Sequence, residues 1–173
     1  LKDIEIARRL GADGVVFGCL TADGEVDLTS MQILMEASKG LSVTFHRAFD
    51  VCRNPQKALE EIIELGCNRI LTSGQQPTAE QGIGLLKELQ GLAAGRITLL
   101  ADCGVNENNI ARIAAETGIN EFHFSARESI QSEMKFRNEV VSMGGTVHIN
   151  EYERNVTSVR RVKETVEALY KGM

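Results

Sequence analysis

The hydrophobic residues of this chain fall into short runs that recur at a regular spacing. Five apolar runs stand out, each followed by turn residues and a helical pattern, and they cover residues 14–18, 41–45, 69–72, 96–100 and 121–125. Successive runs are about 24–28 residues apart, which is the length of one strand–helix unit. The pattern therefore predicts repeated βα units, which build a parallel sheet covered by helices.

Residues with capping chemistry mark the ends of the expected helices. Side chains that can cap a helix N-terminus precede three of them, and glycines that can take a left-handed C-terminal conformation follow three. The expected N-caps are Asn54 (before Pro55), Thr78 and Asn106, and the expected C-caps are Gly40, Gly66 and Gly118. A last amphipathic helix is predicted over residues 157–171, with Val159, Val162, Val166 and Leu169 on its inner face.

Two architectures fit this alternation: an open doubly wound sheet and a closed (β/α)8 barrel. No G-x-G-x-x-G motif follows the first apolar run, and the even period with polar strand ends favours the TIM-type barrel. A barrel needs eight strands, whereas the chain shows about five βα units, to which residues 146–149 could add an extended segment. We therefore expect one partial TIM-type α/β barrel domain over residues 1–173, with the N-terminal strands of the barrel missing from this chain.

Composition and charge narrow the functional classes. The chain has a net charge of -5, 43% hydrophobic and 25% charged residues, and no cluster of basic residues, which argues against nucleic-acid binding. No apolar run reaches the roughly 20 residues of a membrane span. The four cysteines form no C-x-x-C pair, which favours free thiols in a reducing cytoplasm.

Polar side chains gather where the predicted strands end. Because the carboxyl ends of parallel strands meet at one edge of the sheet, these side chains are expected to share one region. The candidates, in chain order, are Cys19; His46, Arg47, Asp50 and Cys52; Thr72, Ser73 and Gly74; Asp102, Cys103 and Gly104; and His123, Ser125 and Arg127. The period-two alternation of a strand places His46 and His123 toward the same interior. Structural alternatives stay open: buried hydrogen-bonded histidines, an Arg47–Asp50 ion pair that bridges two strand ends, and a helix cap at Asp102.

Several motifs resemble the CutC family, known as copper homeostasis proteins. They are TFHRAFD at residues 44–50, LTSG at 71–74, EFH at 121–123, SAR at 125–127, MKFRN at 134–138 and EY at 151–152. The resemblance implies a TIM-type barrel, a homo-oligomer, and N-terminal cysteines as copper ligands in a segment that precedes this chain. The sequence Ala101-Asp102-Cys103-Gly104 departs from the glycine-rich loop that is common in the family.

Two functions follow from these residues. The first is a cytosolic Cu(I)-binding protein, with Cys19, Cys52 and Cys103 as thiolate ligands, assisted by the two histidines. The second is a barrel enzyme that acts on a small anionic or phosphorylated metabolite. In that case His46, Arg47, Asp50 and His123 are the catalytic candidates, and the anion would bind among Thr72, Ser73, Gly74, Gly104, Ser125 and Arg127. A partner-binding role for a truncated chain is a third alternative.

Overall fold

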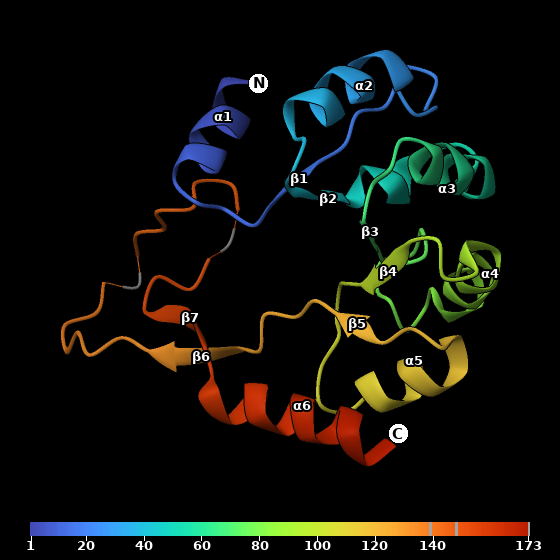
Figure 1. Cartoon of the computed structure of the whole chain (residues 1–173). Helices are drawn as coiled ribbons and strands as arrows, with labels where there is room; N and C mark the ends of the chain where they lie inside the picture. The colour runs from blue at the N-terminus through green and yellow to red at the C-terminus, as the bar shows by residue number, and fades with distance from the viewer. Residues whose placement is uncertain (139, 148, 173) are drawn as a thin grey trace.

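Strands and helices alternate along the chain in the computed structural model, which describes residues 1–138, 140–147 and 149–172 (Figure 1). The elements are α1 (Lys2–Arg9), β1 (Gly14–Phe17), α2 (Leu28–Ala37), β2 (Ser42–Phe45), the 3-10 helix η1 (Arg47–Val51), α3 (Pro55–Glu64), β3 (Arg69–Thr72), α4 (Ile83–Ala93), β4 (Thr98–Ala101), α5 (Ile110–Thr117), β5 (Glu121–Phe122), β6 (Arg127–Gln131), β7 (Glu153–Thr157) and α6 (Val159–Gly172). All five predicted strands are therefore confirmed.

The first five strands form one parallel sheet in the order β1-β2-β3-β4-β5, which is also their order in the sequence. Helices α1 to α5 lie outside this sheet in an arc, with the strands on its inner side (Figure 1). Sequential parallel strands with helices on the outer face are the arrangement of a (β/α)8 barrel, so the predicted fold class is confirmed. Five strands of such a barrel are present in the described part of the chain.

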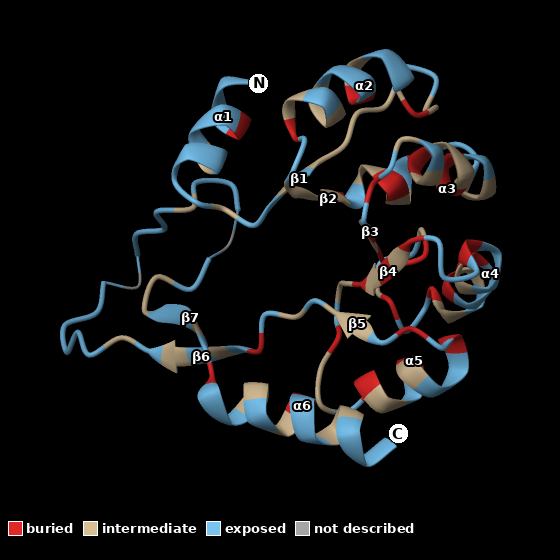
Figure 2. Cartoon of the chain, in the orientation of Figure 1, coloured by how far each residue is buried: buried red, intermediate tan, exposed pale blue. Residues whose placement is uncertain are grey.

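The hydrophobic core lies between the sheet and its helices (Figure 2). Val43, Phe45, Ile70 and Leu99 are buried there, while the alternate residues of the same strands are only partly buried. Residues i and i+2 of a strand share a face, so the apolar face meets the helices as predicted. The other face looks toward the inside of the arc, where Arg69 and Glu121 form an ion pair of 2.6 Å.

The capping predictions hold in part. Asn54 caps α3 as predicted, because its side chain accepts a hydrogen bond from the Lys57 N–H. The N-cap prediction for Asn106 was wrong: α5 begins at Ile110 and has Asn109 at its N-cap, whereas Asn106 accepts a hydrogen bond from the Asn108 N–H within the preceding turn. Asparagine favours such local turns as readily as helix caps.

Thr78 likewise caps a turn rather than a helix. Its hydroxyl accepts a hydrogen bond from the Gln81 N–H, but α4 begins at Ile83. The three glycines expected after helices, Gly40, Gly66 and Gly118, do have positive φ angles of 84°, 85° and 77°. Glycine takes this left-handed conformation without the steric cost of a Cβ.

An antiparallel hairpin, β6 and β7, was not predicted. It lies on the open side of the arc in Figure 1. The extended segment expected at residues 146–149 was placed wrongly: Thr146 and Val147 lie in a turn and Ile149 in a loop, while His148 is outside the described residues. The extra strand comes later, at β7, because Glu153–Thr157 pairs with Arg127–Gln131.

The terminal helix is present, but its inner face differs from the prediction. Val159 is 85% exposed and Val166 is also exposed, whereas Thr165 is fully buried and Leu169 packs against the core. Helix α6 packs against α5. The Thr165 hydroxyl donates a hydrogen bond of 2.7 Å to the Arg161 carbonyl, which lets a polar side chain face the core. No helix in the described ranges is long and apolar enough to cross a membrane.

Candidate functional site

Asp50 links the carboxyl ends of β2 and β3. One carboxylate oxygen accepts hydrogen bonds from the Thr72 hydroxyl at 2.6 Å and from the Ser73 and Gln75 N–H groups at 3.0 and 3.2 Å. The other oxygen accepts from the Ser73 hydroxyl and from Arg47 Nε at 3.1 and 2.7 Å. The Asp50 side chain is only 6% exposed, so this set of donors stabilises a buried negative charge.

Arg47 projects from this network toward solvent. Its side chain is 41% exposed, and a second nitrogen donates a hydrogen bond of 3.0 Å to the Ser73 hydroxyl. The hydrogen bond to Asp50 raises the pKa of Arg47, with smaller contributions from the charges of Cys103 and Asp102. Arg47 therefore lies within electrostatic reach of the end of β4. The predicted ion pair between strand ends is present, and Asp50 positions the guanidinium.

Thr72 and Gly74, which were predicted to bind an anion, instead stabilise the loop that follows β3. Thr72 is fully buried, and its hydroxyl accepts a hydrogen bond of 2.9 Å from the Gly74 N–H. Gly74 has a φ of 70°, and a Cβ there would lie 2.6 Å from the Gly82 carbonyl oxygen. Glycine is required where the backbone approaches another chain segment this closely. These residues shape the loop that presents Ser73 and Arg47.

A second pair of polar residues joins β4 and β5. Asp102 Oδ1 lies 3.0 Å from Nδ1 of His123. The Asp102 side chain is 15% exposed and the imidazole is 62% exposed. Burial raises the pKa of Asp102, but hydrogen bonds from His123 and from the Cys103 N–H outweigh that effect, so its pKa is lowered. Asp102 does not cap α5, which begins eight residues later at Ile110.

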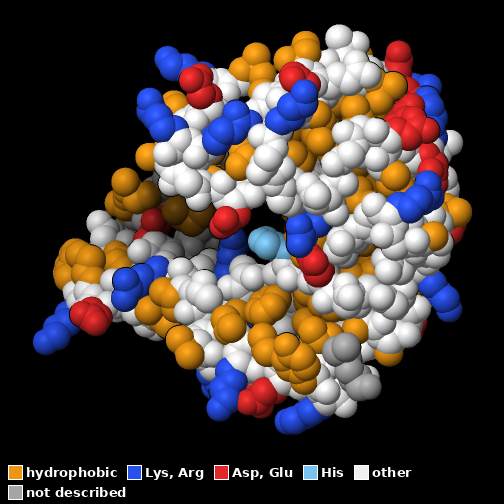
Figure 3. Space-filling model, in the orientation of Figure 1, with side chains coloured by type: hydrophobic (Ala, Val, Ile, Leu, Met, Phe, Trp, Pro, Cys, Tyr) orange, Lys and Arg blue, Asp and Glu red, His pale blue; other side chains and the backbone are white. Residues whose placement is uncertain are grey.

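The Asp102–His123 pair borders a cavity of about 470 Å³. Its walls come from the ends of β4 and β5 and from α6, and the lining includes Gly104, Ser125, Arg127 and Arg161. Three of the predicted anion-binding residues are thus brought together. Figure 3 shows a hollow in this view of the molecule, with a histidine between basic and acidic side chains.

The backbone of the cavity wall offers hydrogen-bond donors. Val105 and Ala126 line the cavity and are buried, and their N–H groups form no hydrogen bond with the described residues. The same holds for the N–H of Ser125. Backbone N–H groups that no other protein group occupies can donate hydrogen bonds to a bound ligand. Such a set of amides, next to Arg127, suits an anion.

Arg161 lines this cavity and pairs with Glu107, and neither residue was predicted. Arg161 Nε and a second nitrogen donate hydrogen bonds of 3.0 and 3.1 Å to the two oxygens of Glu107. That hydrogen bonding lowers the pKa of Glu107. Arg161 lies on α6, which is far from β4 in sequence, so no local motif marked it. Since Glu107 already compensates its charge, Arg161 orders the wall more than it attracts an anion.

His46 has contacts of its own at the ends of β1 and β2. Its Nδ1 accepts a hydrogen bond of 3.2 Å from the Ala48 N–H, so it caps η1. A Cβ at Gly18 would lie 2.8 Å from that nitrogen, which shows how closely the end of β1 approaches the ring. In the described part of the chain, no hydrogen bond joins His46 to His123. His46 therefore shapes the neighbouring strand end.

The three cysteines proposed as metal ligands have different surroundings. Cys52 is buried and its sulfur lies 3.5 Å from Gln75 Nε2, while Cys103 is half-buried and its sulfur lies 3.6 Å from Asp102 Oδ2. Burial raises the pKa of both thiols. Cys19 is half-buried. Within the ranges that the structure describes, no three His, Cys, Asp or Glu side chains are grouped to hold a metal ion.

Comparisons with known proteins agree with the predicted resemblance. The model of the CutC family matches residues 1–128. A family protein CutC from Bacteroides thetaiotaomicron is 77% identical over 169 residues, which cover 98% of this chain and 68% of the relative. One from Porphyromonas gingivalis is 48% identical over 167 residues, which cover 96% of this chain and 67% of the relative. The chain thus spans about two thirds of the length of these proteins.

Solved structures support the same relationship. One from Streptococcus agalactiae, whose printed description names CutC and copper homeostasis, aligns with a TM-score of 0.68 and 32% identity over 70% of this chain and 60% of that chain. A structure described as native KDPGal aligns with a TM-score of 0.58 over 99% of this chain and 65% of that chain. Its identity is 14%, so it shows a likeness of fold alone.

Proposed function

Because the chain belongs to the CutC family, we propose that its carboxyl-end cavity binds a small anionic metabolite and that His123 transfers a proton there. The Asp102–His123 hydrogen bond of 3.0 Å carries this proposal. Asp102 holds Nδ1 and thereby leaves Nε2 of a largely exposed ring for a ligand. An acid–base group needs such an orienting partner and access to the reacting atom.

The anion would be held by the wall that faces this histidine. Arg127 supplies positive charge, and the Ser125 hydroxyl and the N–H groups of Ser125 and Ala126, which bond to no described residue, supply donors. Arg47 lies within electrostatic reach of Asp102 and Cys103, so it can contribute from the β2 side. The Asp102 carboxylate opposes an anion, and the positive charges of Arg127 and Arg47 would offset that charge. A phosphorylated or carboxylated metabolite fits this combination of groups.

Binding can be tested with a panel of phosphorylated and carboxylated metabolites, inorganic phosphate included, by calorimetry. We expect an organic anion to bind, and Arg127→Gln to weaken its binding by about tenfold, as expected for one charge-assisted contact. Arg154→Gln on β7 outside the cavity lining is the matched control and should leave the affinity unchanged. Equal weakening by both substitutions, or no binding by any anion, would refute the proposal.

A second candidate function is copper handling, and the printed description of the Streptococcus agalactiae relative favours it. Copper would be cargo, and thiolates are ligands that suit Cu(I). Cys19, Cys52 and Cys103 remain the candidates at the carboxyl ends, although in the described part of the chain they belong to no group of three or more metal-ligating side chains. The predicted cytoplasmic location and homo-oligomeric state also stay predictions.

An anaerobic Cu(I) titration against a competing chelator tests this second candidate. It should compare this chain with a version extended by the N-terminal strands of its relatives. Tight binding by this chain, lost on joint substitution of Cys19, Cys52 and Cys103 by alanine, would support the carboxyl-end thiols. Tight binding by the extended version alone would place the copper site in the preceding segment.

A further inference from the structure

Two sulfur atoms do lie together, at the opposite end of the sheet. Cys67 Sγ is 3.8 Å from Sδ of Met35. Cys67 follows the C-terminus of α3 and precedes β3, and Met35 is in the last turn of α2. The fold therefore brings a thioether from α2 and a thiol from the loop between α3 and β3 together at the amino ends of β2 and β3, 32 positions apart in the sequence.

The separation of the two sulfurs suits a shared metal ion. With metal–sulfur bonds of about 2.3 Å, sulfurs 3.8 Å apart subtend an angle of roughly 110° at one ion. That angle matches three- or four-coordinate geometry and leaves room for a further ligand. Thiolate and thioether are both soft donors, which favour Cu(I) over hard cations such as Mg²⁺ or Ca²⁺.

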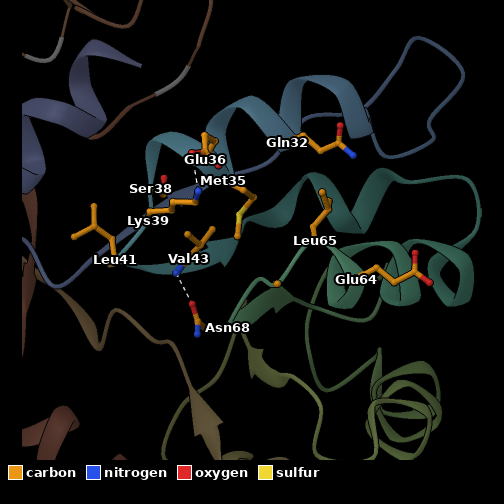
Figure 4. A pocket seen from close by; sticks show the side chains of 12 residues that line it. Gln32, Met35, Glu36, Ser38, Lys39, Leu41, Val43, Glu64, Leu65 and Asn68 are labelled. Carbon is orange, nitrogen blue, oxygen red and sulfur yellow. Dashed lines mark hydrogen bonds and ion pairs between the residues drawn. The ribbon is translucent and has the colours of Figure 1, made fainter.

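A pocket adjoins this pair on the Met35 side. It has a volume of about 580 Å³ and lies between the ends of α2 and α3, where Met35, Val43 and Leu65 form its apolar wall. In Figure 4 the Met35 side chain points from α2 toward Val43 on β2. The residues on both sides of Cys67, Gly66 and Asn68, also line the pocket. Met35 therefore borders the pocket directly, whereas Cys67 is 5% exposed and lies between two residues that line it.

An unpartnered polar group marks the same pocket. Ser38 lines it and is 2% exposed, and the Ser38 hydroxyl has no hydrogen-bond partner among the described residues. A buried hydroxyl without a partner costs free energy, which a bound ion or its ligand could recover. Among the charged side chains at the pocket, Lys39 pairs with Glu36 at 2.7 Å, and Glu64 also lines it. The soft donors near the pocket are the two sulfurs, on which selection of a soft cation would depend.

We propose that Cys67 and Met35 form a two-sulfur site for a soft monovalent cation of the Cu(I) type, separate from the carboxyl-end residues. The site deepens the copper-handling candidate and rests on it. On binding, the Cys67 thiol releases one proton to solvent and the thiolate and thioether coordinate the ion, without any change of oxidation state. Burial raises the pKa of Cys67 to about 11, so the free thiol is protonated at neutral pH and the ion must displace that proton.

The test is an anaerobic Cu(I) titration of the reduced chain against a chelator, with four proteins compared. Met35→Leu keeps the volume of the side chain and removes its sulfur, so we expect the affinity to fall roughly tenfold or more while the melting temperature changes little. Cys67→Ala should abolish the site. The joint alanine substitution of Cys19, Cys52 and Cys103 is the matched control and should retain it. Mass spectrometry should show that Cu(I) protects Cys67 from alkylation.

The outcomes separate this site from the copper-handling candidate itself. If the joint substitution removes binding while Met35→Leu and Cys67→Ala retain it, copper is bound at the carboxyl ends and the two-sulfur site is wrong. If none of the four proteins binds Cu(I), both ideas fail for this chain. Protection of Cys67 that does not depend on Met35 would also overturn the paired site, even if Cys67→Ala proved unstable.

Discussion

Asp102 at the end of β4 lies 3.0 Å from His123 just beyond β5, so the carboxylate of one strand end orients the imidazole of the next. The carboxylate is mostly buried and the ring is mostly exposed. This asymmetry fixes one ring nitrogen against the protein and presents the other to the cavity. Neighbouring parallel strands are what bring the two residues together, 21 positions apart in the sequence.

Replacing Asp102 with asparagine should impair proton transfer more than ligand binding. Asparagine keeps the shape but replaces the carboxylate that holds Nδ1 of His123, and its amide can favour the other tautomer. We expect a loss on the order of a hundredfold in a His123-dependent turnover rate, with less than a threefold change in ligand affinity. Kinetics with a metabolite identified by the binding panel would measure both. An unchanged pH profile and rate would show that Asp102 does not position the ring.

The same substitution gives a stability prediction with a definite sign. The pKa of Asp102 is lowered from 3.8 in the folded chain, so its charged form contributes stability above pH 3.8. That contribution is lost as the pH falls through the folded-state pKa. The difference in unfolding free energy between the parent chain and Asp102→Asn should therefore be present at pH 6 and shrink below about pH 4. Denaturant titrations at several pH values measure it, and a difference that grew in acid would contradict the sign.

The sheet could be predicted from the sequence because its strands are local and apolar. In β2 the buried Val43 and Phe45 alternate with half-buried residues, and in β3 Ile70 and Thr72 do the same. Such period-two alternation can be recognised in a single sequence. The Asp50 network was partly visible too, since Arg47 and Asp50 are three residues apart. Its completion by Thr72 and Ser73 depends on strand pairing, and parallel neighbours could be inferred from the order of the βα units.

Other features depend on long-range pairing that no local pattern reveals. The strands β6 and β7 are polar and are separated by 21 residues, so neither alternation nor a tight turn marked them. Arg161 reaches the cavity only because α6 packs against α5. Met35 and Cys67, which lie in contact, are each unremarkable in sequence, because a methionine and a cysteine usually read as core residues.

Arg47 and Asp50 should have different effects when they are replaced. Asp50 is nearly buried and accepts several hydrogen bonds, so Asp50→Ala should cost about 3 kcal/mol of unfolding free energy, since it leaves these donors unpaired. Arg47 is more exposed, so Arg47→Ala should cost about 1 kcal/mol while it weakens anion binding. Chemical denaturation and calorimetry together measure these effects. An equal loss of stability, with unchanged binding for Arg47→Ala, would contradict the assigned roles.

The ion pair between Arg69 and Glu121, inside the arc of strands, should weaken at high salt concentration. Arg69 donates hydrogen bonds of 2.6 and 3.2 Å to the two oxygens of Glu121, and both side chains are about one third exposed. A paired geometry of this kind, in contact with solvent, is worth less than about 1 kcal/mol. A double-mutant cycle with Arg69→Met and Glu121→Gln should give a coupling of that size, and 1 M salt should reduce it. A coupling that salt leaves unchanged would show that the pair is shielded from solvent.

The four thiols should react with an alkylating reagent in two groups. Cys19 and Cys103 are partly exposed, whereas Cys52 and Cys67 are buried. Only thiolates react, and burial raises the pKa of Cys67 to about 11, so its rate is limited both by access and by the small thiolate fraction. At pH 8 we expect Cys19 to react first and Cys67 last, with rates that differ by roughly a hundredfold or more.

Cys103 should react more slowly than Cys19, because burial and the charge of Asp102 raise the pKa of the Cys103 thiol. Time-resolved peptide mass spectrometry gives all four rates at once, and a Cys67 rate equal to that of Cys19 would mean that the contact with Met35 opens readily in solution.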